Sequence, residues 1–191
     1  MGQLVRSMDL AGPENLELKT MSWGGKGRHS PQANFCRPIR SPGRNLFEKY
    51  NVPHILDLLS IDIDYDDYWV WKAIDLHRFD ARAVVIEYNW DISYTEHRVV
   101  DPNDKQRWTG TNHFGASILA MTTLGKKRGY TLVYAEREGV NLFFVKTDIL
   151  QCQNVLDQVM PIDKLAIKNP GWQHRMELDK NRTWIWNDTS I

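Results

Sequence analysis

The chain has 191 residues, 42% of them hydrophobic, which is enough for one domain with a sizeable core. It carries 24 basic and 24 acidic residues, so no net charge points to nucleic acid or to a membrane surface as a partner. The two cysteines lack metal-binding spacing and are predicted to be free thiols. The sequence shows no apolar run as long as a membrane helix and no secretory signal, which predicts a cytoplasmic protein.

Residues 1–43 are predicted to form an extended basic arm. No strand or helix periodicity extends over a useful length there, and Gly, Pro, Ser and Arg dominate from Ser22 to Gly43. Residues 26–44 contain basic side chains but no acidic one. The glycines of residues 22–30 follow no strand and precede no helix pattern, which favours a flexible linker over a phosphate-binding loop.

A folded domain is predicted for residues 44–150. It begins with a short helix over residues 44–52. Residues 55–61, with the sequence ILDLLSI, form a continuous apolar run that is typical of a strand covered on both faces. Residues 66–76 repeat apolar and aromatic side chains near the helical period, which predicts an amphipathic helix.

The second half of this domain continues the alternation of strands and helices. Residues 83–88, AVVIEY, predict another buried strand, and a long polar loop over residues 90–111 follows it. Residues 114–129 predict a helix with basic residues in its last turn. Residues 130–136 and 140–146 flank a short turn and predict an antiparallel hairpin.

This order predicts an α/β fold with an open sheet, in which the first two strands are parallel and the last hairpin adds an antiparallel edge. Ligands of such sheets bind outside the carboxyl ends of the strands. The rule gathers around one crevice the polar residues that follow the first two strands. These are Asp62, Asp64 and Tyr65 after the first strand, and Glu87 and Asn89 after the second.

Asp62 and Asp64 form an Asp-x-Asp pair, whose side chains point the same way if the segment is extended. Such a pair could bind a divalent cation, contact a ribose, or supply a base whose pKa is raised by mutual repulsion. The simpler interpretation is a pair of solvated carboxylates that cap the next helix. Glu87 and Asn89 either line the same crevice or lie in water at a strand end. No metal is assigned.

The chain resembles the carboxyl half of FkbM-related methyltransferases from about Asn45 to Leu150. The matching segments are LFEKYNVP, DLLSIDID, DYWVWKAI, VVIEYN, GTNHFGASILAM and LGKKRGYTLVYAEREGVNLFFV. Those enzymes are class I, Rossmann-like and dependent on S-adenosylmethionine. The resemblance implies a partial sheet of strands equivalent to 4-5-7-6, with the last strand antiparallel. It also implies a catalytic role for Asp62 and Asp64. The position of Glu87, Asn89 and Tyr65 at the predicted crevice indicates a substrate-binding role for these three residues.

The resemblance does not extend to the half that holds the cofactor in those enzymes, with its Gly-rich turn after the first strand. No acidic-x-Gly-x-Gly sequence precedes Ile55, and Tyr65-Asp66 stands where the family usually has Gly-Asn. The N-terminal cofactor-binding half is therefore predicted to be missing, and no cofactor-binding residue is assigned. Two hypotheses follow: S-adenosylmethionine-dependent methyl transfer to an unknown acceptor, or a non-catalytic binding or assembly module. A glycosyltransferase with a divalent metal, suggested by Asp-x-Asp alone, is a third.

A sheet that begins at residues 55–61 would leave unpaired backbone groups along that strand. We expect the basic arm, the tail of residues 151–191 around Trp184, or a second copy of the chain in a homodimer to cover this edge. Within the tail, residues 183–188 predict either a late strand or a tryptophan-bearing cover.

Overall fold

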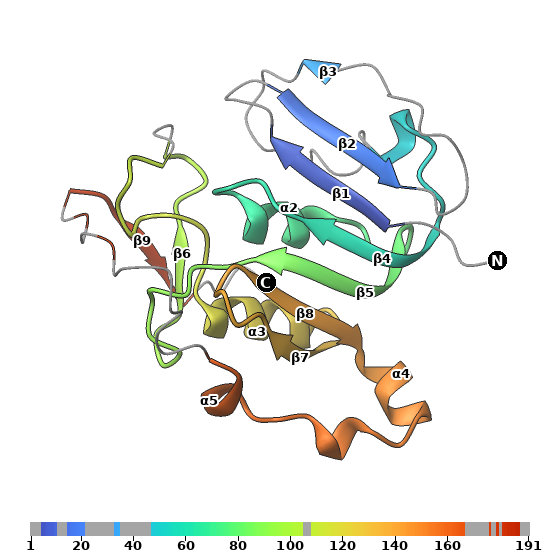
Figure 1. Cartoon of the computed structure of the whole chain (residues 1–191). Coiled ribbons are helices and arrows are strands. Elements are labelled where there is room, and N and C mark those ends of the chain that lie inside the picture. Colours follow the sequence, from blue (N-terminus) through green and yellow to red (C-terminus); the bar gives the residue numbers. More distant parts are fainter. Residues whose placement is uncertain are drawn as a thin grey trace.

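The chain folds into a mixed seven-stranded sheet in the order β3-β2-β1-β4-β5-β8-β7, and a separate pair of strands is formed by β6 and β9 (Figure 1). In chain order the strands are β1 (Val5–Leu10), β2 (Asn15–Met21), β3 (Ala33–Asn34), β4 (Ile55–Ile61), β5 (Asp80–Glu87), β6 (Arg98–Val100), β7 (Tyr130–Ala135), β8 (Asn141–Lys146) and β9 (Trp184–Trp186). The helices are α2 (Asp67–Ala73), α3 (Ile118–Lys127), α4 (Thr147–Cys152), the 3-10 helix η1 (Leu156–Gln158) and α5 (Ile162–Leu165).

The computed structural model describes only part of the chain. The described residues are 5–10, 15–21, 33–34, 47–104, 108–166, 176, 179 and 181–187. Within them, no helix has the length and apolar character that crossing a membrane requires. Cys152 is an exposed free thiol, whereas Cys36 and most of the basic stretch of residues 26–44 lie outside the described residues.

The predicted α/β class is confirmed in the four neighbouring strands β4, β5, β8 and β7. β4 and β5 are parallel neighbours, and their side chains Leu59, Ile61, Val84 and Ile86 are buried. β8 pairs antiparallel with both β5 and β7, so β7 runs parallel to β5. The hairpin lies at the edge of the sheet as predicted, and its last strand β8 is antiparallel; β8 lies next to β5, so that β7 is the outermost strand.

The N-terminal strands correct the prediction of an arm without strands over residues 1–43. β1 pairs in parallel with β4, and β2 and β3 follow as antiparallel neighbours. The edge of β4 supplies backbone partners that the short segment of β1 cannot find within its own sequence. Because β1 pairs with β4, a segment of the predicted arm covers this edge, which is one of the three alternatives expected; dimerisation through this edge loses its support and stays a prediction.

Two further elements concern the predicted polar loop and tail. The loop after β5 contains the short strand β6, which pairs antiparallel with β9 in the register Val99↔Ile185. The prediction of a late strand around Trp184 is thus confirmed. The helix α4 runs across residue 150, and the boundaries of the predicted domain and tail stay predictions.

Helix α3 has the end signals expected from its sequence. The Ser117 side chain accepts a hydrogen bond from the Ala120 backbone N–H at 3.1 Å, which satisfies one of the free donors at the helix start. Lys126 and Lys127 lie in the last turn, where basic side chains interact favourably with the helix dipole. Gly129 follows with a φ of 81°, the left-handed conformation typical of a helix end.

Gly125 of α3 allows helix and sheet to approach closely. A Cβ atom at this position would lie 2.7 Å from Cε1 of Phe144 and 3.0 Å from Cη2 of Trp71. Trp71 is fully buried and packs against the rings of Tyr130 and Phe144. The helices α2 and α3 therefore meet on one face of the sheet around the Trp71 ring.

Substitution of Gly125 by alanine is expected to destabilise the fold by about 1 kcal/mol. The gain in helix propensity is about 1 kcal/mol, and displacing two buried rings costs about 1–3 kcal/mol. Chemical denaturation measures the difference, with Lys126→Ala at the neighbouring exposed position of α3 as the control. A Gly125→Ala variant at least as stable as the wild type would contradict the close packing.

Candidate functional site

Three carboxylates meet at the carboxyl ends of β4 and β5. Asp62 and Asp64 follow β4, and Glu87 is the last residue of β5. Because the two strands are parallel neighbours, their ends lie at the same edge of the sheet. One carboxylate oxygen of each residue lies within 4.8 Å of those of the other two. We call Asp62, Asp64 and Glu87 the carboxylate triad, which the structure brings together as the strand pattern predicts.

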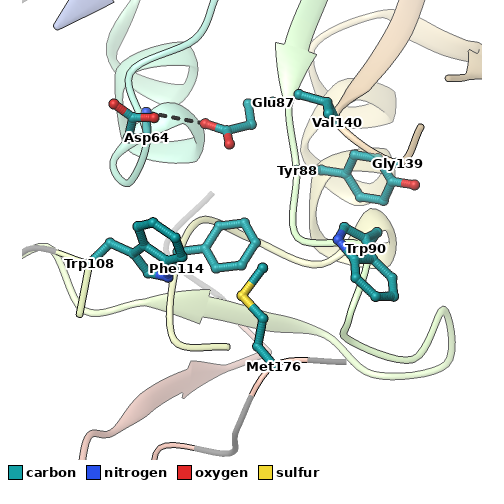
Figure 2. Close-up of a pocket in the computed structure, with 9 residues that line it drawn as sticks. All are labelled: Asp64, Glu87, Tyr88, Trp90, Trp108, Phe114, Gly139, Val140 and Met176. Carbon is teal, nitrogen blue, oxygen red and sulfur yellow. Dashed lines mark hydrogen bonds between the residues drawn. The ribbon is translucent and has the colours of Figure 1, made fainter. Parts of the chain in front are cut away.

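A tight turn, not an extended strand, brings Asp64 to Glu87. Asp64 has a φ of 66°, in the left-handed region that Asp tolerates better than most residues. Its backbone N–H donates a hydrogen bond to Oε2 of Glu87 at 3.1 Å (Figure 2). The prediction of an extended Asp-x-Asp segment is therefore wrong at Asp64. Tyr65, which stands where the resembled family usually has Gly, does not have a positive φ.

A fourth carboxyl group, from Asp67 at the start of α2, lies against this turn. Asp67 is 1% exposed, and its Oδ1 accepts a hydrogen bond from the Ile63 backbone N–H at 3.0 Å. Its Oδ2 is buried and has no hydrogen-bond partner among the described residues. Burial raises the pKa of the Asp67 carboxyl well above its usual range, and the charge of Glu87 adds to this effect.

Glu87 holds its proton more tightly than an ordinary glutamate. Burial raises the pKa of Glu87 to about 8, with further contributions from the charges of Asp62 and Asp64. The hydrogen bond from the Asp64 N–H acts in the opposite direction, because it stabilises the ionised carboxylate. A carboxyl with such a pKa changes its charge near neutral pH, which is the range a general base requires.

A cavity of about 130 Å³ opens beside two members of the triad. Figure 2 shows Asp64 and Glu87 at one end and the rings of Trp108 and Phe114 with Met176 at the other. The indole N–H of Trp90 is buried and has no hydrogen-bond partner among the described residues. The full lining consists of Asp64, Glu87, Tyr88, Trp90, Trp108, Phe114, Gly139, Val140 and Met176.

Asn89 was predicted to contact substrate, but its side chain is used inside the fold. It is fully buried, and its Nδ2 donates to the backbone oxygens of Asn112 and Phe114, both at 2.8 Å. Its Oδ1 accepts from the Asp91 backbone N–H at 3.0 Å. These bonds hold the loop that carries Phe114 against the end of β5, so Asn89 shapes the cavity without lining it.

Tyr65 also has internal partners. It is 2% exposed, and its hydroxyl lies 3.1 Å from Nδ1 of His113 and 3.4 Å from Oδ2 of Asp104. The same hydroxyl accepts a hydrogen bond from Arg182, whose Nε donates to Asp104 at 2.8 Å. His113 in turn contacts the Thr183 backbone oxygen at 2.9 Å. Tyr65 therefore anchors residues 181–187 to the domain, and its predicted role in substrate binding stays a prediction.

The cavity includes residues that the sequence did not single out for binding. Trp90 and Trp108 were visible as aromatic residues in a polar loop, but nothing there indicated that they share a cavity with the carboxylates. Nothing in the sequence indicated that Gly139, Val140 and Met176 line a cavity. The first two lie in the β7–β8 hairpin and Met176 lies in the tail, and only the folding of these segments brings them to the cavity.

Comparison with known proteins does not identify a function for this site. The chain matches no family model, no curated protein and no solved structure with which it was compared.

Proposed function

We propose that this chain is an S-adenosylmethionine-dependent methyltransferase whose acceptor binds in the cavity beside Asp64 and Glu87. The resemblance of residues 45–150 to FkbM-related enzymes is the reason for proposing methyl transfer as the reaction. The strand order β4-β5-β8-β7 supports it, because the resemblance implies these neighbours as 4-5-7-6 with an antiparallel last strand. A partial Rossmann-like sheet is part of this proposal.

The observation that carries the proposal is a titratable carboxylate at the wall of an apolar cavity. When bound, S-adenosylmethionine would supply an electrophilic methyl group for the acceptor atom and a neutral thioether as the leaving group. The proton released by the acceptor passes to Glu87, whose pKa of about 8 suits this role near neutral pH. Most of the rate enhancement is expected from positioning of the two reactants.

The cavity also suggests the size and chemistry of the acceptor. A cavity of about 130 Å³ resembles in size the apolar cavities of about 150 Å³ that bind benzene. The unpartnered indole N–H of Trp90 favours a ligand with a hydrogen-bond acceptor. The acceptor is therefore expected to be a ring-sized apolar molecule that carries a hydroxyl group, with the cofactor outside this cavity.

Calorimetric titration of the intact chain with S-adenosylmethionine tests the proposal. We expect one saturable site with a Kd below about 1 mM, the usual range for an enzyme and its substrates. A nucleotide sugar with Mn²⁺ serves as the comparison ligand, since its binding would instead favour the glycosyltransferase hypothesis. The absence of heat and of a thermal shift at millimolar S-adenosylmethionine would contradict the methyltransferase proposal.

A second candidate, a non-catalytic binding or assembly module, is favoured by the N-terminal strands. β1 and β2 pair antiparallel in the register Leu10↔Leu16. The few residues between them cannot form the crossover helix that a parallel connection requires. The cofactor-binding half of the resembled enzymes therefore has no counterpart between β1 and β2. This candidate predicts that Asp62→Asn leaves the binding of a protein partner unchanged.

A further inference from the structure

The spacing of the carboxylate triad matches the coordination distances of a divalent cation. Oxygen ligands lie about 2.4 Å from Ca²⁺, so two ligands of one ion are at most about 4.8 Å apart. The triad oxygens lie within 4.8 Å of one another. They come from two adjacent strand ends that the parallel pairing of β4 and β5 holds in register.

The charges of Asp64 and Glu87 are not neutralised by basic side chains in the described part of the chain. Among the described residues, no Lys or Arg forms an ion pair with Asp64 or Glu87. The Asp64 backbone N–H contributes a single hydrogen bond to Glu87. Carboxylates this close repel one another unless a proton or a cation lies between them.

An independent observation comes from Asp67, which lies beneath the turn that carries the triad. Its Oδ1 is fixed by the Ile63 N–H, and Ile63 separates Asp62 from Asp64. Its Oδ2 is buried without a partner in the described structure. A buried polar atom normally has a hydrogen bond, so the partner inferred for this oxygen is an ion or a water bound to one. The adjoining cavity leaves room for the water or substrate ligands that complete a coordination shell.

We propose that the carboxylate triad binds a divalent cation of the oxygen-preferring class, such as Mg²⁺, Mn²⁺ or Ca²⁺. Two carboxylates come from the turn after β4 and one from the end of β5. Asp67 supports the turn from below and accepts a hydrogen bond from a metal-bound water. The site does not depend on methyl transfer and would serve equally a binding module. With the cation bound, Glu87 is an ionised ligand, so its proposed role as a base belongs to the metal-free protein.

Titration of the intact chain with Mn²⁺, with free Mn²⁺ measured by electron paramagnetic resonance, tests the proposal without any cofactor. One bound ion per chain is expected. Asp64→Asn is expected to weaken binding at least tenfold, because it removes one charged ligand while asparagine still tolerates the left-handed backbone. Ca²⁺ and Mg²⁺ are expected to compete for the same site.

Asp157→Asn, at an exposed position in η1, is the matched control and is expected to bind Mn²⁺ like the wild type. Circular dichroism and thermal unfolding establish that Asp64→Asn is folded, and Asp62→Asn provides a second variant of the same triad. Wild-type protein that binds no Mn²⁺ at millimolar concentration, or folded Asp64→Asn with unchanged affinity, would overturn the site. Either result leaves the calorimetric test with S-adenosylmethionine unaffected.

Discussion

Replacement of Arg182 by alanine is expected to lower the free energy of unfolding by about 3 kcal/mol, because it breaks a buried ion pair. The Arg182 side chain is 6% exposed and that of Asp104 is 19% exposed, with a 2.8 Å contact between them. Without the guanidinium, the Asp104 carboxylate and the Tyr65 hydroxyl each lose a buried donor. Denaturation in urea measures this loss.

Arg82→Ala is the matched control for this prediction. Arg82 forms an ion pair with Asp57 at 3.2 Å, but the two side chains are 61% and 45% exposed. Water screens such a pair, so its loss is expected to cost less than about 1 kcal/mol. Equal, small losses in the two variants would contradict a buried network that anchors residues 181–187.

The central strands and α3 could be predicted because their signals are local. ILDLLSI and AVVIEY are continuous apolar runs, and strands covered on both faces require such runs. The hairpin of β7 and β8 joins adjacent segments through the five residues 136–140, which include Gly139 with a φ of 78°. Each of these elements carries its own pattern, so no distant partner was needed to recognise it.

The elements that were missed depend on distant partners. β6 has three residues, and its partner β9 lies more than eighty positions later in the chain. β1 mixes charged and apolar residues, and its pairing is set by the free edge of β4, far from it in sequence. Non-local pairing of this kind leaves little trace in a short segment, since tertiary context determines strand formation.

The candidate site was predictable in its backbone position but not in its side-chain roles. The carboxyl ends of two parallel strands bring Asp62, Asp64 and Glu87 together, and this follows from strand order alone. Tyr65 and Asn89 follow the same strands, yet they turn into the fold because His113, Arg182 and the loop before α3 offer them partners. Those partners lie on segments whose packing no local pattern describes.

Glu87→Gln is expected to raise the free energy of unfolding at pH 8 by about 4 kcal/mol in metal-free protein. The folded pKa of Glu87 is about 8 and the ordinary value is 4.5, so the folded state binds more protons between these values. The contribution of Glu87 to stability is present below pH 4.5 and is lost as the pH rises through 8. Glutamine keeps the acceptor for the Asp64 N–H without the charge.

Urea denaturation at pH 5 and pH 8, with a chelator present, measures this effect. At pH 5 the folded wild type is protonated at Glu87 and only the unfolded chain is partly ionised there, so the two proteins are expected to differ by no more than about 1 kcal/mol. Glu138→Gln, at an exposed position of the hairpin turn, removes a charge outside the triad and is expected to leave stability unchanged at both pH values. If Glu87→Gln were less stable than the wild type at pH 8, burial and the repulsion within the triad would not be the dominant effects on this carboxylate. A stabilisation that disappears when Mn²⁺ is added would instead link the same charge to the proposed cation, because the ion stabilises the ionised form that the mutation removes.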